Sequence, residues 1–139
     1  MAKILLVGQD EALLEGLVQS LVSLGHSPDV ALSLADAREL ASRAQPLLTV
    51  VDRRFAAASG AEVLGLPMAP GGALVLYRTT GSMALALPPG LQRAVLADLT
   101  LPLERNRLAA LAQTVEERAR ATGRMRSERD EPPQETRSP

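Results

Sequence analysis

Asp52 is the residue of this chain whose type and position are best suited to chemistry. It follows the apolar residues 47–51, and a carboxylate at the carboxyl end of a buried strand can accept a phosphoryl group or ligate a metal ion. Phosphoryl transfer relies on a cation that neutralises the phosphate oxygens, and Mg²⁺ is held through carboxylates. The other apolar run, residues 4–7, is followed by Gly8 and Gln9, where companion acids would be needed. The sequence therefore predicts an acceptor carboxylate without a complete metal pocket.

Several nearby residues could take part in chemistry at Asp52. Arg53 and Arg54 follow it directly, and Arg78 follows another apolar run; an arginine beside a carboxylate balances its charge without a metal. Three roles for Asp52 stay open: a loop-capping acid, a residual phosphoryl acceptor, and an acid paired with an arginine. Asp10 is interpreted as a helix cap rather than a ligand, because it precedes a helical pattern.

The composition excludes several classes of site. The chain of 139 residues has no Cys and one His, so thiol chemistry, disulfides and a His-based metal cluster are excluded. With no nucleophile–base pair, we do not expect an enzyme. A formal net charge of −1 gives no electrostatic reason to expect nucleic acid or a membrane surface as a partner. No apolar stretch reaches the ~18 residues of a membrane span, so we expect a cytoplasmic protein.

Strands and helices alternate along the chain in the predicted pattern. Strands are predicted over residues 4–7, 30–32, 47–51, 73–77 and 94–99, and helices over residues 11–24, 34–45, 61–66 and 103–122. Residues 55–60 are predicted as a loop, and 83–87 as a turn or so of helix that Pro88, Pro89 and Gly90 stop. This alternation predicts an α/β fold, a parallel sheet with helices on both faces.

The carboxyl ends of the strands should form the functional edge of such a sheet. We expect this edge to gather a mostly polar set: Gly8, Gln9, Asp10, Asp52, Arg53, Arg78, Thr79, Thr80, Thr100 and Leu101. After Gly123 the chain becomes rich in charge and proline, a composition that cannot bury enough apolar surface to order itself. The sequence thus predicts one domain over residues 1–122 and a disordered tail over 123–139.

The order of these elements resembles the response-regulator receiver (CheY-like) domain, the phosphoacceptor module of two-component signalling, over residues 3–122. The resemblance rests on four segments: residues 4–7 with 10–14, Pro46 ahead of Asp52, residues 60–64, and residues 99–102. It implies a flavodoxin-like, doubly wound sheet of five parallel strands. The third and fourth helices should be degenerate here, and the C-terminal helix long.

The departures from the family pattern all fall on its phosphorylation site. In the family, two acids after the first strand help to bind Mg²⁺; Gly8 and Gln9 stand there. A Lys that pairs with the phosphoryl group precedes the Pro after the fifth strand; here it is Leu101. A Ser or Thr ends the fourth strand, and that switch position falls on Tyr77 or on Thr79, depending on the direction of counting.

We therefore predict a pseudo-receiver that keeps the fold, binds no cofactor and acts by phosphorylation-independent protein–protein interaction. The resemblance implies signalling partners such as a histidine kinase or an output protein, and the final helix suits a partner contact or a homodimer. One alternative is a working phosphoacceptor on Asp52, with weak Mg²⁺ binding, in which Asp10 or an arginine substitutes in the pocket. Another is a small-ligand binder that uses the loops around Gly8 and Thr79.

Overall fold

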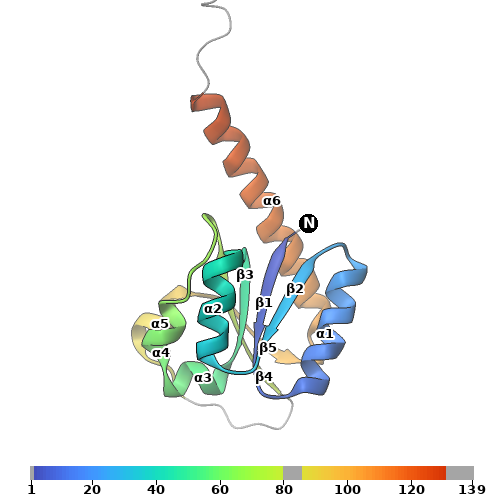
Figure 1. Ribbon diagram of the computed structural model, residues 1–139, viewed down its shortest axis with the longest axis vertical. Helices are drawn as coiled ribbons and strands as arrows, with labels where there is room; N and C mark the ends of the chain where they lie inside the picture. The colour runs from blue at the N-terminus through green and yellow to red at the C-terminus, as the bar shows by residue number, and fades with distance from the viewer. Residues whose placement is uncertain (1, 80–85, 131–139) are drawn as a thin grey trace, which may run out of the picture.

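The chain folds around one sheet of five parallel strands in the order β2-β1-β3-β4-β5 (Figure 1). The structure is a computed structural model that describes residues 2–79 and 86–130, with side chains as far as residue 121. The strands are β1 (Lys3–Val7), β2 (Ser27–Ala31), β3 (Leu48–Asp52), β4 (Ala73–Thr79) and β5 (Val95–Leu101). The predicted doubly wound α/β fold is confirmed.

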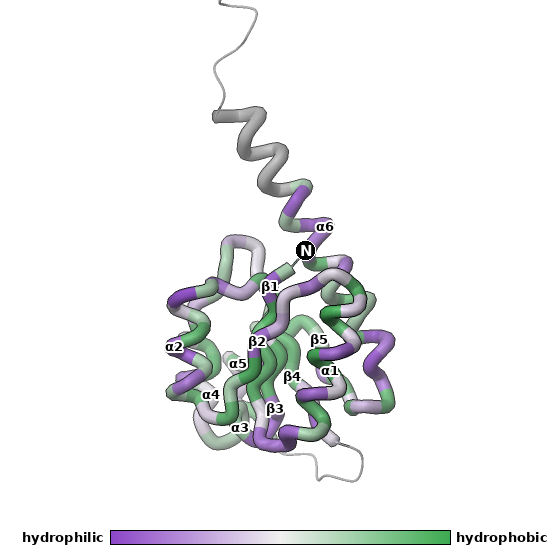
Figure 2. The backbone as a smooth tube through the Cα atoms, turned by 45° about the vertical axis from the view of Figure 1, so that its right-hand side comes forward, coloured by the Kyte–Doolittle hydropathy of each residue, from purple (hydrophilic) through white to green (hydrophobic). Residues whose placement is uncertain are grey.

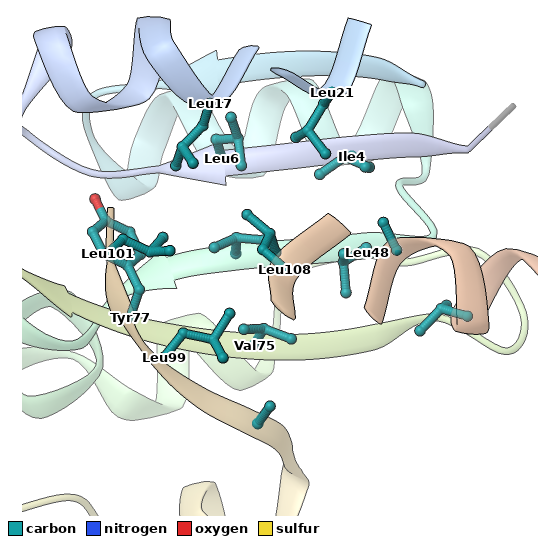
Figure 3. Close-up of a cluster of buried hydrophobic side chains, with 14 of the residues drawn as sticks. Ile4, Leu6, Leu17, Leu21, Leu48, Val75, Tyr77, Leu99, Leu101 and Leu108 are labelled. Carbon is teal, nitrogen blue, oxygen red and sulfur yellow. The ribbon is translucent and has the colours of Figure 1, made fainter. Parts of the chain in front are cut away.

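Side chains alternate between the two faces of the sheet, so each face carries its own core. On one face, strand residues such as Ile4 and Leu6 pack under α1 (Glu11–Ser23) and α6 (Arg105–Asp130), as Figure 3 shows. On the other, residues such as Leu5 and Val7 pack under α2 (Leu34–Ala44) and three short helices. Figure 2 shows that the central strands are mostly apolar, whereas polar and apolar residues alternate along the helices around them.

The first two helices begin and end where the sequence predicts. The Asp10 carboxylate accepts a hydrogen bond from Leu13 N–H at 3.1 Å and caps α1, and Gly25 follows that helix with a φ of 89°. Ser33 Oγ caps α2 by accepting from Asp36 N–H at 3.1 Å. Gln45 then adopts a left-handed conformation that ends α2 one residue before Pro46.

Two details of the predicted elements are wrong in the first half of the chain. Residues 55–60 are not a loop: α3 (Arg53–Ala58) begins directly after β3, followed by α4 (Gly60–Leu64). The alanine-rich sequence of α3 favours a helix, and Asp52 caps α3. The second strand begins at Ser27 rather than at residue 30, since an edge strand tolerates Pro28 and Asp29.

The segment after β4 also differs from the prediction. Pro88, Pro89 and Gly90 stand at the start of a helix that the sequence does not predict, α5 (Pro89–Ala94). Proline is favoured at the first helical position, where its missing N–H would have no partner anyway. Of the turn of helix predicted over residues 83–87, 83–85 lie outside the described residues, and 86 and 87 are irregular. The predicted shortening of the helices around β4 is confirmed by α3, α4 and α5.

The last helix, α6, extends farther than the sequence predicts. It runs from Arg105 to Asp130 rather than ending near residue 122, and its outer part projects beyond the sheet (Figure 1). The predicted disordered tail over residues 123–139 stays a prediction, although the Arg, Met and Glu residues of 124–130 are good helix formers even without a core to cover. Residues 131–139 lie outside the described residues. No helix in the described part of the chain is both long and apolar enough to cross a membrane.

Candidate functional site

The carboxyl edge of the sheet brings Asp52 next to Gly8 and Tyr77. Val7, the residue before Gly8, pairs with Val51, and Asp52 pairs with Tyr77 on the adjacent strand. One step further out, Thr79 pairs with Leu101. Of the two candidates for the switch position, Tyr77 is therefore the one in register with Asp52.

Asp52 is buried and makes several hydrogen bonds to one residue, Arg54. Its side chain is 5 % exposed, and its Oδ1 accepts from the backbone N–H of Arg54 at 2.9 Å, which caps α3. Arg54 Nη2 donates to Oδ2 at 2.8 Å, and Nε lies 3.3 Å from both oxygens. Hydrogen bonding and charge attraction to Asp52 raise the pKa of the Arg54 guanidinium. Both carboxylate oxygens are thus occupied by one neighbouring residue.

The other two candidate arginines have different partners. Arg53 forms an ion pair with Asp98 on β5, and Arg78 Nε donates to Thr100 Oγ1 at 3.4 Å. Asp10, the other acid expected at this edge, is exposed and serves as the α1 cap. The geometry therefore combines two of the roles left open for Asp52, a cap and an arginine-paired acid.

Tyr77 fills the space beside Gly8. Its side chain is fully buried, and its hydroxyl finds no hydrogen-bond partner among the described residues. A Cβ added to Gly8 would overlap the Tyr77 hydroxyl oxygen and lie 3.2 Å from Cζ. Burial, and secondarily the charge of Asp52, raise the pKa of the Tyr77 phenol well above its usual range. The phenol thus stands as a neutral group beside the buried carboxylate.

Leu101 completes an apolar wall at this edge. It is fully buried in the same core cluster as Tyr77, and Figure 3 shows the two side chains next to each other. A leucine cannot balance charge, so β5 brings no cation to the site from this position. Thr79, its neighbour on β4, is half-buried.

Two hollows border this edge. A cavity of about 230 Å³ opens beside the ion pair, lined by Gln9, Asp52, Arg54, Phe55 and Ala58. A groove of about 450 Å³ lies between α1 and the β5–α6 connection, lined by Asp10, Ala12, Leu13, Gly16, Leu17, Thr79, Leu101, Pro102 and Arg105. Gln9 and Asp10 therefore face different hollows, although they are neighbours in the chain. Thr80 lies outside the described residues.

Sequence reasoning missed two features of the site. Asp98, the partner of Arg53, sits on the edge strand β5, where alternation alone marks it as an ordinary outward-facing residue. The fit between Gly8 and Tyr77 joins two strands that are not neighbours, so no local pattern shows it. One sequence signal points to it: Tyr77 is the only Tyr of the chain and directly follows four aliphatic residues, 73–76.

Comparison with known proteins rests on structure alone, since no family model and no curated protein matches the chain. A receiver domain (CheY-like) from Methylobacillus flagellatus superposes with a TM-score of 0.67 at 22% identity, over 83% of this chain and 98% of that one. The signal receiver domain of a putative Luxo repressor protein from Vibrio parahaemolyticus gives 0.65 at 17% identity, over 89% and 96%. The fold is that of a receiver domain.

A longer neighbour shows the same fold within a larger protein. NtrX from Brucella abortus, solved in complex with ADP, gives a TM-score of 0.71 at 18% identity over 92% of this chain. This chain spans 29% of the length of that one. At these identities the similarity establishes the fold alone.

The residues at this edge do not fit the Mg²⁺ that the receiver family implies. Gly8 has no side chain, and Tyr77 occupies the space that one would need. Asp52 is engaged by Arg54. Within residues 2–79 and 86–121, no three His, Cys, Asp or Glu side chains gather closely enough to hold a metal ion. Since Mg²⁺ requires near-octahedral oxygen ligands, a lone engaged carboxylate is a poor site for it.

Proposed function

We propose that this chain is a pseudo-receiver: a receiver-fold domain of two-component signal transduction that works by protein–protein contact and is not switched by phosphorylation of Asp52. The observation that carries the proposal is the state of Asp52, which is buried, caps α3 and is paired with Arg54. These are the interactions of a structural acid. The proposal includes no metal cofactor and no enzymatic activity, and we place the domain in the cytoplasm.

The charge balance of the edge opposes phosphorylation. A phosphoryl group on Asp52 would bring additional negative charge to a buried position, and transfer depends on cations that stabilise it. Leu101 offers none, and among the described residues no three His, Cys, Asp or Glu side chains gather to hold a metal ion. Asp10, the other acid at this edge, caps α1. The Arg54 bonds to the carboxylate would also have to break before either oxygen could react.

One observation favours a second candidate function, a working phosphoacceptor. The Arg54 side chain is 56% exposed and borders the 230 Å³ cavity beside Asp52. A guanidinium that turned into this cavity would bind phosphate oxygens in a bidentate manner. In that case Arg54 would take over part of the charge-neutralising role of a metal.

We further propose that the partners are signalling proteins, such as a histidine kinase or an output protein, and not nucleic acid or membrane. One structural neighbour is described as a response regulator receiver modulated diguanylate cyclase from Pelobacter carbinolicus, with a TM-score of 0.66 at 19% identity. In this chain, the part of α6 that projects beyond the sheet is the element available for a partner or for a second copy.

Phosphoryl transfer from a small donor separates the two candidate functions. Incubation with acetyl phosphate and Mg²⁺, followed by intact-mass spectrometry, should detect no covalent phosphoryl adduct on the wild-type protein. Asp52→Asn, which keeps an oxygen for the α3 cap, is the matched control. An adduct that forms on the wild type and not on Asp52→Asn would overturn the pseudo-receiver and support the phosphoacceptor.

A further inference from the structure

Glycine is required at position 8 because a side chain would have no space there, and not because the backbone adopts a conformation that only glycine tolerates. The described glycines with a positive φ are Gly25 and Gly71, so the backbone of Gly8 would accept other residues. Its Cβ, however, would overlap the Tyr77 hydroxyl oxygen and lie 3.2 Å from the ring carbon Cζ and 3.6 Å from Leu14 Cδ1. No side chain fits at position 8 while Tyr77 stays in place.

Tyr77 cannot move aside. Its ring is fully buried in the core cluster that includes Leu14, Leu99 and Leu101 (Figure 3), and close-packed interiors resist such shifts. The hydroxyl has no hydrogen-bond partner among the described residues, so no polar interaction explains its position. What the hydroxyl does at this edge is occupy volume beside Gly8.

Arg54 is the other group that closes off Asp52, and it is held far less firmly. Its side chain is 56% exposed, whereas Tyr77 is 0% exposed. An exposed guanidinium exchanges readily between a carboxylate and water. The ion pair alone would therefore delay a competing cation and would not exclude it.

We propose that the Tyr77 phenol is a steric plug in the space of a metal-binding side chain at position 8, and that this plug, rather than the Asp52–Arg54 ion pair, closes the strand edge to divalent cations. The inference rests on the proposed function, because it gives the structural reason for the missing metal chemistry. The proposal also implies that the side chain tolerated at position 8 depends on the residue at position 77. A hard cation such as Mg²⁺ or Mn²⁺ is the ligand class of the site that removal of the plug should open.

Mn²⁺ binding to matched variants tests the plug. The readout is paramagnetic broadening of amide NMR signals around Asp52. Gly8→Asp/Tyr77→Thr adds a carboxylate and removes the plug, and it should bind Mn²⁺ at least about tenfold more tightly than Tyr77→Thr alone. Arg54→Met, which removes the ion pair and keeps the plug, should show no Mn²⁺-dependent broadening around Asp52. A folded double variant without that gain, or binding by Arg54→Met as tight as that of the double variant, would overturn the proposal.

A stability measurement covers the case in which the double variant does not fold. Gly8→Ala should lower the melting temperature by on the order of 5–10 °C in the presence of Tyr77. In a Tyr77→Phe background the overlapping oxygen is gone, and the same substitution should cost less than half as much. Equal losses in the two backgrounds would show that Tyr77 does not fill the place of a side chain at position 8.

The same titrations separate failure of the plug from failure of the proposed function. Saturable Mn²⁺ binding at Asp52 of the wild-type protein would contradict both. A silent wild type together with a silent, folded double variant would contradict only the plug, and the pseudo-receiver would stand.

Discussion

The ends of β3 and β4 place two buried polar side chains in register, those of Asp52 and Tyr77, and the two have opposite surroundings. Asp52 on β3 is surrounded by donors, with a backbone N–H and a guanidinium from Arg54. Tyr77 on β4 has no hydrogen-bond partner among the described residues and is surrounded by apolar side chains. Hydrogen bonds and an ion pair fix the Asp52 side chain, whereas close apolar packing fixes the Tyr77 ring. The carboxylate is thus satisfied by hydrogen bonds, while the space beside it is filled by a side chain that makes none among the described residues.

The largest effect on stability is expected from removing the packed Tyr77 ring. Tyr77→Ala should lower the free energy of unfolding by about 3–5 kcal/mol, because it leaves a cavity in a close-packed core. Chemical denaturation monitored by circular dichroism measures this loss. Tyr77→Phe is the control that keeps the ring. A loss under about 1 kcal/mol for Tyr77→Ala would mean that the ring is not tightly packed.

Removing the interactions of Asp52 should have a smaller effect. Asp52→Ala deletes the α3 cap and should cost about 1–2 kcal/mol, whereas Asp52→Asn keeps a capping oxygen and should cost less. Denaturation of the two variants side by side gives the difference. Equal losses would show that the charge pair with Arg54, and not the cap, carries the contribution of Asp52.

Alkaline titration tests whether the phenol is as isolated as its surroundings indicate. Burial raises the pKa of Tyr77 in the folded state, while an unfolded chain ionises its tyrosine near pH ~10. The stability that Tyr77 contributes is therefore fully present below that pH and is lost as the pH rises above it. Because the chain has one Tyr, the ultraviolet absorbance of tyrosinate reads this group alone. Tyrosinate that appears near pH ~10 while the protein is still folded would contradict the burial.

The smallest effect isolates the hydroxyl itself. Tyr77→Phe removes a buried polar atom that has no partner among the described residues, so the change in the free energy of unfolding should lie between zero and a gain of about 1 kcal/mol. Denaturation in the same series of experiments measures it. A loss of more than about 1 kcal/mol would reveal a favourable interaction of the hydroxyl.

The fold and the ends of the first two helices could be predicted from the sequence, because apolar runs and capping residues are local signals. Asp10, Ser33 and Gly25 are such signals, and each does in the structure what its residue type favours. The helix α5 was not predicted, because the prolines that can end one element can also begin the next.

The closure of the site depends on contacts that no local pattern encodes. The sequence named three arginines near Asp52, yet the choice of Arg54 follows from where α3 begins, and α3 itself was predicted as a loop. The overlap of Gly8 with Tyr77 joins β1 to β4 across β3. Such long-range fits require the register of the sheet, which appears only in the folded chain.

The most direct test of the account is a two-dimensional amide NMR titration of the wild-type protein with Mg²⁺ and then with beryllofluoride, a mimic of the phosphoryl group on Asp. We predict a well-dispersed spectrum in which the signals around Asp52 do not shift. Saturable shifts around Asp52 that are lost in Asp52→Asn would contradict the account and make the domain a phosphorylation switch with an unusual pocket.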